Sequence, residues 1–255
     1  MNTEEYARMY ARERTHWWYV GMRAVAKALI DGKVGTGHPL EVLDAGCGTG
    51  AGLEWLARYG RVTGFDLSDE ALGFCRERGL RRLVRGSVEY LPFPDARFDL
   101  VATFDVLYHQ WVADDGRALR ELWRVLRPGG WLVLRVPALR WLAGRHDAAV
   151  YTRHRYSRAE VIARLTAAGF VVERATYANC LLLPLVGAKR LAERWASGSP
   201  ADLDSTPGWL NSVLKRVLGL EAQLLRRMSF PVGVSVLALA RRPEAASGRA
   251  WSGAG

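Results

Sequence analysis

The sequence has few cysteines, no long apolar run and very little lysine. Its cysteines, Cys47, Cys75 and Cys180, are odd in number and form no C-x-x-C pair, which argues against a disulfide framework or a zinc site and for a reducing compartment. No stretch approaches the roughly 18 uninterrupted apolar residues of a membrane-spanning helix. The start, MNTEEYARMYARERTHWW, is too charged for a signal peptide. We therefore expect a cytoplasmic protein.

Positive charge is in excess. The 255 residues include 36 basic and 26 acidic ones, a net charge of +10, and nearly all the basic residues are arginine. One interpretation is a compositional bias on a solvated surface. The others are attraction to anionic substrates, to nucleic acid or to an anionic membrane face. Nucleic acid is the weakest of these because no long basic run is present.

Strands and helices alternate from residue 40 onward. Apolar runs predict strands at 40–45, 61–66, 80–86, 97–107, 131–138, 171–178 and 235–242. Helical patterns occupy 51–60, 68–79, 114–130 and 157–170, and Ser68 and Gly79 are the expected caps of the second. Residues 3–31 are predicted to be a helical arm in which Thr15 caps the second helix. This alternation predicts an α/β fold with a parallel sheet covered on both faces.

A helical insert precedes the last strand. We expect a single domain over 1–242, divided into an arm or lid (1–36), a core (37–137), a substrate-side segment (138–179), the insert (180–230) and the last strand (231–242). The tail, 243–255, is small and polar and is predicted to be disordered. The second helix of the insert is expected to place one set of apolar residues on a single face: Leu210, Val213, Leu214, Val217, Leu218, Leu224, Leu225 and Met228.

The stretch EVLDAGCGTG follows the first predicted strand. Gly46, Gly48 and Gly50 allow a sharp turn and a close approach to a ligand. Their even spacing is neither G-x-G-x-x-G nor a P-loop, because the G-K-[ST] element is missing. Asp44 would repel a pyrophosphate and would favour a ligand that carries an ammonium or sulfonium charge.

The second strand ends in Asp66, whose carboxylate can accept hydrogen bonds from both hydroxyls of a ribose. Leu67 beside it offers an apolar face for an adenine. Together with the glycine loop, these residues predict a nucleoside site with a cationic tail. The simpler interpretations are a tight strand–helix turn and an aspartate that only caps the next helix.

Residues 40–136 resemble the class I S-adenosylmethionine-dependent methyltransferases. The motifs that carry the resemblance are VLDAGCGTG, VTGFDLS, SVEYLPFPDARFDLVATFDVLYH and LRELWRVLRPGGWLVL. The resemblance implies a Rossmann-like, doubly wound sheet of seven strands, with the last strand antiparallel. It also implies S-adenosylmethionine as the methyl donor and S-adenosylhomocysteine as the product.

The same resemblance assigns the cofactor residues. It implies that Gly46, Gly48 and Gly50 line the methionine part, that Asp44 holds its amino group and that Phe104 lies beneath it. Asp66 would bind the ribose, and Leu67 would flank the adenine. Many relatives have an aspartate where this sequence has Ser87, which weakens the adenine contact expected there. The Ser87 hydroxyl and the Val88 backbone remain candidates for contacting the base.

His109, in FDVLYHQW, is the main catalytic candidate, because a histidine of near-neutral pKa suits a general base. The alternative is a structural or cofactor-side role. Tyr108 and His154 are further candidates. No metal site is expected.

Two segments are candidates for substrate binding. The first is 145–157, which contributes Tyr151, Arg153, Arg155 and Tyr156; its arginines could pair with a carboxylate or phosphate. The alternative for this segment is a solvated, arginine-rich crossover. The second is the trio Trp17, Trp18 and Tyr19, either as a lid over the cofactor or as the packing face of the arm.

The leading hypothesis is methyl transfer to a small biosynthetic metabolite, with the insert as part of the substrate pocket or a homodimer surface. The second is a methyltransferase for an isoprenoid, quinone or lipid, in which the insert makes a peripheral membrane contact through Lys215, Arg216, Arg226 and Arg227. The third is a non-catalytic protein that binds S-adenosylmethionine. Nucleic acid is not expected as a partner, because the fourth strand does not end in the Asn/Asp-Pro-Pro-aromatic run used on flipped bases.

Overall fold

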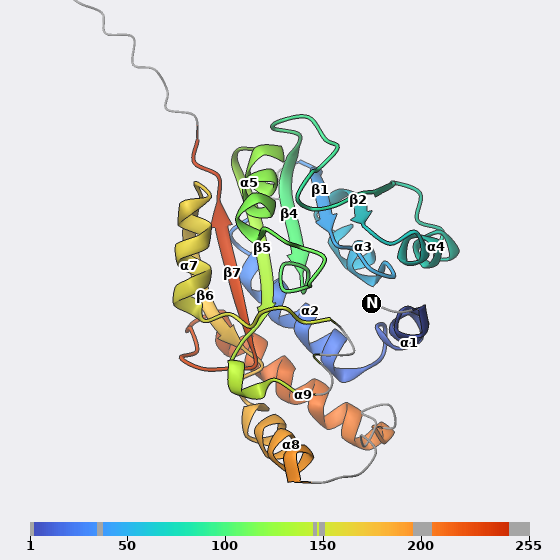
Figure 1. The fold of residues 1–255 in the computed structure, drawn as a ribbon, viewed down its shortest axis with the longest axis vertical. Helices are drawn as coiled ribbons and strands as arrows, with labels where there is room; N and C mark the ends of the chain where they lie inside the picture. The colour runs from blue at the N-terminus through green and yellow to red at the C-terminus, as the bar shows by residue number, and fades with distance from the viewer. Residues whose placement is uncertain (1–2, 35–37, 145–146, 148–150, 196–205, 245–255) are drawn as a thin grey trace, which may run out of the picture.

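The chain folds around one seven-stranded sheet in a computed structural model that describes residues 3–34, 38–144, 147, 151–195 and 206–244 (Figure 1). The order in the sheet is β3-β2-β1-β4-β5-β7-β6. Six strands point in the same direction, and β7 runs antiparallel to its two neighbours, β5 and β6. The strands are β1 (Leu40–Ala45), β2 (Gly60–Asp66), β3 (Leu83–Arg85), β4 (Phe98–Phe104), β5 (Leu126–Pro137), β6 (Val171–Ala178) and β7 (Ser235–Arg241). The predicted fold class is confirmed.

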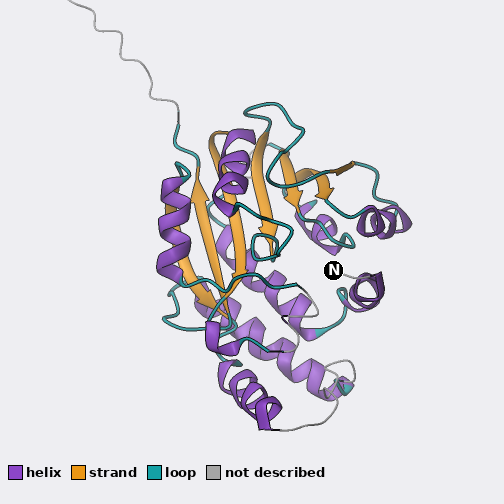
Figure 2. Cartoon of the chain, in the orientation of Figure 1, coloured by secondary structure: helices purple, strands orange, loops and turns teal. Residues whose placement is uncertain are grey.

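Helices cover both faces of the sheet (Figure 2). The described helices are α1 (Thr3–Arg12), α2 (Trp17–Ile30), α3 (Ala51–Leu56), α4 (Asp69–Glu77), α5 (Asp115–Val125), the 3-10 turn η1 (Arg140–Leu142), α7 (Arg158–Ala167), α8 (Leu183–Trp195) and α9 (Gly208–Leu225). Alternation along β4 shows the layering: Val101 faces the cluster that contains α5 and α7, whereas Leu100 faces the cluster that contains α2, α3 and α9.

Several helix ends differ from the sequence predictions. The helix predicted to reach Gly60 ends at Leu56, because Gly60 already pairs with Leu40 at the start of β2. The helix predicted to end at Pro128-Gly129-Gly130 ends at Val125. The chain becomes extended at Leu126, and β5 starts there.

The caps were partly predicted. Ser68 caps α4 by accepting a hydrogen bond from the Ala71 N–H, and Gly79 follows the helix with φ of 80°. Thr15 does not cap α2. The cap is His16, whose Nδ1 accepts from the Trp18 N–H at 3.3 Å.

The apolar face predicted for α9 is wrong in part. Leu214, Leu218 and Leu225 are buried, but Val213, Leu224 and Met228 are exposed. The inner face packs on α2 so closely that a Cβ added to Gly21 would lie 2.2 Å from Leu218 Cδ1. Which apolar residues of α9 are buried depends on the face that packs against α2, and the sequence does not show which face that is.

Glu221 is the unexpected residue of this inner face. Its carboxylate is fully buried and accepts hydrogen bonds from the backbone N–H groups of Cys180 at 2.8 Å and Leu181 at 3.0 Å. Glu221 therefore holds the turn that connects β6 with α8 against α9. No helix in the described part of the chain is long and apolar enough to cross a membrane. Most of the tail predicted to be disordered lies outside the described residues.

Candidate functional site

The glycine loop leaves β1 at the carboxyl edge of the sheet. Gly46, Gly48 and Gly50 have φ of 94°, 53° and 98°, values that favour glycine. A Cβ on Gly46 would lie 2.1 Å from Val106 Cγ2, so the loop lies directly against the segment that follows β4. Gly50 then begins α3 as its left-handed N-cap. The loop is a bare backbone surface at the point where a ligand of such a sheet lies.

Asp66 holds this loop in place. Its Oδ2 accepts from the Gly48 N–H at 2.9 Å, and its Oδ1 accepts from the Ser68 N–H at 2.9 Å. Burial raises the pKa of Asp66, and these hydrogen bonds oppose the rise. Each carboxylate oxygen has a second lone pair, so Asp66 can hold the loop and still accept two ribose hydroxyls.

Asp44 is a buried acid beside the loop, only 2% exposed. Burial raises its pKa to about 7, and the negative charges of Asp66 and Glu13 add to the rise while Arg135 opposes it. A Cβ on Gly52 would lie 2.3 Å from Asp44 Oδ2, so a side chain at this position would clash with the carboxylate. The negative charge of ionised Asp44 is therefore only partly compensated, by Arg135, and a cationic ligand would supply further positive charge.

Two thiols lie under the loop. Cys75 Sγ donates to the Gly48 carbonyl at 3.2 Å, and the Sγ atoms of Cys47 and Cys75 are 4.0 Å apart without a disulfide. Both side chains are buried. They pack with Leu53 and Leu72 and support the loop from the α4 side.

The N-terminal helix α1 covers the loop from the other side. A Cβ on Gly48 would lie 2.9 Å from Met9 Cε. Tyr6 is 8% exposed; burial and the charge of Asp66 raise its pKa to about 12, and a hydrogen bond with the Ser68 side chain opposes the rise. In the structure α1 therefore covers the glycine loop. That the arm acts as a lid over the cofactor stays a prediction.

A buried ion pair fastens this cover. Glu13, 5% exposed, accepts a hydrogen bond from the Thr49 hydroxyl and pairs with Arg78 Nη2 at 2.6 Å. Arg78 Nε also donates to the Thr49 carbonyl at 2.7 Å, and its guanidinium lies 4.2 Å from the centre of the Tyr10 ring. We call Glu13, Thr49 and Arg78 the latch. Sequence reasoning missed it, because three distant positions form it.

The Trp17–Tyr19 trio divides between two places. Trp17 is buried in a cluster with Leu182, Leu214 and Leu218, so it packs the arm against α9. Trp18 instead lies against the Arg135 guanidinium, 4.8 Å from its ring centre, and Tyr19 meets the Trp18 ring edge-on. Only Trp18 and Tyr19 remain beside the site.

The ends of β4 and β5 contribute a pair that the sequence reading overlooked. Arg135 Nε donates to Asp105 Oδ2 at 2.9 Å, and Asp105 has a left-handed φ of 56°. The guanidinium lies 5.3 Å from the centre of the Phe104 ring. Phe104 is thus at the predicted strand end, and Arg135 connects it to Trp18. The arginine inside the apolar run WLVLRVPA was the available signal.

His109 lies in the loop after β4. Its ring stacks on Tyr108, with centroids 4.2 Å apart. Tyr108 is buried, and burial raises its pKa above the ordinary value. The Arg153 N–H donates to the Tyr108 carbonyl at 2.8 Å, so the candidate substrate segment lies alongside the candidate catalytic loop.

The side chains of 151–156 mostly have partners within the chain. His154 Nε2 is 2.8 Å from Glu160 Oε1, Arg155 Nε donates to Asp147 Oδ1 at 2.9 Å, and Arg153 Nη1 donates to the Ala113 carbonyl at 2.9 Å. Tyr151 is 37% exposed and packs near Trp111. These contacts favour a structural role for His154 and leave Tyr151 as the more accessible side chain.

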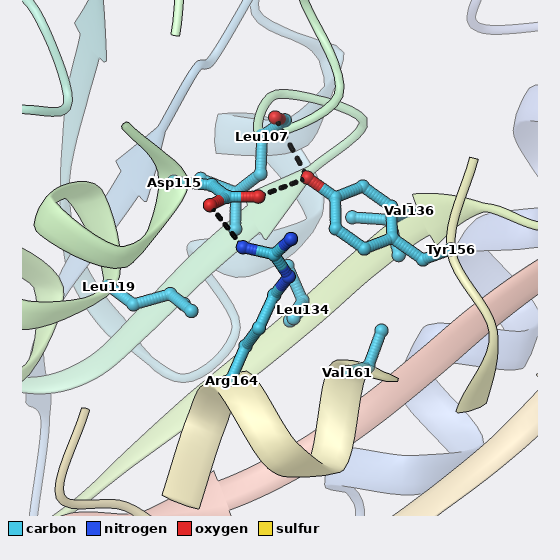
Figure 3. Close-up of a pocket in the computed structure, with 8 residues that line it drawn as sticks. All are labelled: Leu107, Asp115, Leu119, Leu134, Val136, Tyr156, Val161 and Arg164. Carbon is cyan, nitrogen blue, oxygen red and sulfur yellow. Dashed lines mark hydrogen bonds and ion pairs between the residues drawn. The ribbon is translucent and has the colours of Figure 1, made fainter. Parts of the chain in front are cut away.

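Tyr156 is a core residue rather than a surface one. It is 3% exposed, and its hydroxyl donates to Asp115 Oδ2 at 2.7 Å (Figure 3). Asp115 also accepts from Arg164 of α7, and the Tyr156 hydroxyl lies 3.2 Å from the Leu107 carbonyl. The group lines a small cavity. It braces the start of the loop that carries His109.

The expected adenine side is open. Leu67 is 47% exposed, whereas Val88 is buried at 6%. The Ser87 hydroxyl accepts from the Glu89 N–H at 3.3 Å, a local turn contact. No group of three metal-ligating side chains occurs among the described residues.

The glycine loop, the aspartates at the ends of β1 and β2, and the seven-stranded order with antiparallel β7 are features of class I S-adenosylmethionine-dependent methyltransferase domains, which this chain resembles. Residues 43–134 match the family described as Methyltransferase domain. The malonyl-(acyl-carrier protein) O-methyltransferase of Serratia marcescens is 44% identical over 100 residues, 38% of this chain and 38% of that protein. The fatty-acid O-methyltransferase of Mycolicibacterium smegmatis is 39% identical over 117 residues, 42% of this chain and 38% of that protein. The chain thus spans well under half the length of these two relatives.

Solved structures agree on the fold. The S-adenosylmethionine-dependent methyltransferase from Mesorhizobium loti superposes with a TM-score of 0.56 at 20% identity, over 85% of this chain and 98% of that chain. The cyclase SpnF superposes with a TM-score of 0.55 at 24% identity, over 88% of this chain and 80% of that chain. At such identities the likeness shows the fold alone. The methyl donor of the class is S-adenosylmethionine.

Proposed function

We propose that this protein transfers the methyl group of S-adenosylmethionine to a small-molecule acceptor and releases S-adenosylhomocysteine. The observation that carries the proposal is the enclosed carboxylate pair. Asp44 and Asp66 flank a bare glycine backbone, and α1 closes over it. Phosphate ligands do not suit a buried acid and a half-buried one, whereas a nucleoside with a cationic tail does.

Different residues would bind different parts of the cofactor. Asp44 would hold the amino group, the glycines the methionine part and Asp66 the ribose hydroxyls. Leu67, Val88 and Ser87 would lie at the base, and Phe104 below the methionine portion. When bound, the sulfonium supplies a methyl group that an acceptor displaces in line.

The chain itself must orient the acceptor, exclude water and handle one proton. α1 and the latch exclude water from the loop. Trp18 and Tyr19, beside the Asp105–Arg135 pair, offer an aromatic wall for the acceptor. His109 is the proton acceptor that we propose for acceptors that must lose a proton.

We do not infer the identity of the methyl acceptor from the relatives. Their names specify two different acceptors, and the matched family segment ends at residue 134. Candidate acceptor contacts on this chain, such as Arg135 and Tyr151, lie beyond that point.

Two measurements test the proposal. Calorimetry should show that the chain binds S-adenosylmethionine and S-adenosylhomocysteine, and that Asp66→Ala abolishes binding; Asp69→Ala, an exposed acid on α4, is the matched control. A labelled-methyl assay against fractionated metabolites should then show transfer. No binding would refute the proposal, and binding without transfer to any fraction would favour the non-catalytic alternative.

A further inference from the structure

Helix α9 is apolar on two opposite faces. The inner face packs against α2 through Leu214, Leu218 and Leu225. On the opposite side four large side chains are exposed at helical spacing: Trp209 (70%), Val213 (44%), Leu220 (51%) and Leu224 (36%). We call these four residues the outer stripe. A single exposed leucine needs no explanation, but four exposed apolar side chains along one helix face are characteristic of a surface that contacts another molecule.

The exposed charged side chains that the structure describes on and directly after α9 are all positive. Arg216, Arg226 and Arg227 are exposed, and Lys215 is half-buried. From 206 to 232 the sequence contains one acidic residue, Glu221, and its carboxylate is buried on the inner side of α9. Within the described chain, no carboxylate pairs with any of these four cations. The surface therefore suits an anionic partner.

A second helix presents apolar side chains at the same end of the molecule. Leu185 and Leu191 of α8 are each 57% exposed. Figure 1 shows α8 and α9 at the same end of the molecule, away from the end at which β7 finishes. Exposed apolar side chains at this end of the molecule are thus not confined to α9.

A second copy of the chain fits this surface poorly. A two-fold contact through the outer stripe would bring the same uncompensated arginines of both copies together. A helix with an exposed apolar stripe, a tryptophan and flanking cations is instead typical of elements that lie in the plane of a bilayer interface. The chain's net charge of +10 adds a long-range attraction to an anionic surface.

We propose that the outer stripe of α9 docks the protein on a lipid bilayer that contains anionic headgroups. The apolar side chains enter the interface, and Arg216 and Arg227 contact the headgroups. The inner face of α9 contacts Trp17 and Trp18 of α2. Docking through the outer stripe would therefore orient the side of the molecule that contains α2 and α9 toward the lipid. The proposal concerns binding, and it does not depend on the proposed methyl transfer.

Flotation with vesicles tests it, using the full chain. Wild type is expected to float with vesicles of phosphatidylcholine mixed with phosphatidylglycerol, and far less with phosphatidylcholine alone. Arg216→Gln/Arg227→Gln should weaken binding about thirtyfold, and added salt should weaken the wild type. Trp209→Ser/Leu220→Ser should abolish binding.

Matched variants separate the stripe from bulk charge and hydrophobicity. Arg76→Gln/Arg81→Gln removes the same charge elsewhere, and Ile162→Ser/Val171→Ser removes exposed apolar side chains of α7 and β6; both should bind as wild type does. Circular dichroism checks that every variant is folded, and calorimetry with S-adenosylmethionine separately identifies a failure of the proposed function. The proposal is overturned if wild type ignores anionic vesicles or if the matched variants lose binding equally. It is also overturned if the wild type is a dimer that Trp209→Ser/Leu220→Ser turns into monomers.

Discussion

Asp44 combines deep burial with two neighbouring acids, and its protonation should control cofactor binding. Its pKa of about 7 means that, without ligand, proton uptake competes with a cation for the carboxylate. The sign follows from linkage: a ligand that prefers the ionised form binds more weakly as pH falls below the pKa.

We therefore expect affinity for S-adenosylmethionine to rise with pH between about 5.5 and about 7, approaching tenfold per pH unit. Calorimetry across this range measures it. Asp44→Asn should bind weakly and lose most of the slope. An unchanged slope in Asp44→Asn would assign the titration to Asp66 or Glu13 instead.

His109 allows a second prediction at this scale. His109→Gln should lower turnover about a hundredfold or more if the ring accepts the proton of the acceptor, while the affinity for S-adenosylmethionine stays within about twofold of wild type. Steady-state labelled-methyl kinetics and calorimetry measure the two effects. Tyr108→Phe keeps the ring that stacks on His109 and is the control. Full activity of His109→Gln would leave His109 with a structural role.

Residues within a local motif were predictable, and residues paired over long distances were not. Asp44, the glycines and Asp66 lie at strand ends that periodicity alone locates. Glu13 gave no signal, because its partners Thr49 and Arg78 lie far along the chain. Tyr156 and His154 looked like ligand residues by type, yet tertiary contacts with Asp115 and Glu160 occupy them.

The arm is the element whose motion the site requires, because α1 covers the glycine loop and the latch holds it down. Burying one charge against another is stabilising only while both partners are present. Loss of the Glu13 charge leaves the guanidinium of Arg78, nearly inaccessible beside Thr49, with only the more distant Glu54 carboxylate at 3.9 Å.

Glu13→Gln should therefore loosen the arm. We expect about tenfold weaker binding of S-adenosylmethionine, mainly through faster dissociation, and faster tryptic cleavage near Arg12 and Arg14. Stopped-flow displacement and limited proteolysis measure these effects. Glu5→Gln, within α1 and in a surface pair with Arg8, should behave as wild type does. Equal proteolysis rates of the two variants would show that the latch does not hold the arm.

At the scale of the molecule, the layering followed from the strand–helix alternation, and the antiparallel last strand followed from the family resemblance. The side of α9 that packs did not. The apolar residues of α9 extend around more than one face of the helix, and only the contact with α2 determines which of them are buried. Close approach at Gly21 is the feature that makes this contact.

The approach at Gly21 gives a stability prediction. Gly21→Ala forces its new methyl group against Leu218 and should destabilise the protein by about 1–3 kcal/mol. Gly73→Ala in α4, where the new methyl group meets nothing within 4 Å, should be neutral or stabilise by up to about 1 kcal/mol. Urea unfolding compares them. A neutral Gly21→Ala would mean that α9 is not tightly docked.

The two thiols beneath the glycine loop make the opening of this region measurable without any added label. Cys47 and Cys75 are buried, whereas Cys180 is only partly so. An alkylating reagent can therefore reach the pair only during excursions that expose the loop, with Cys180 as an internal reference. The modification rate, followed by mass spectrometry, becomes a clock for those excursions: bound nucleoside should slow it, and a loosened arm should speed it.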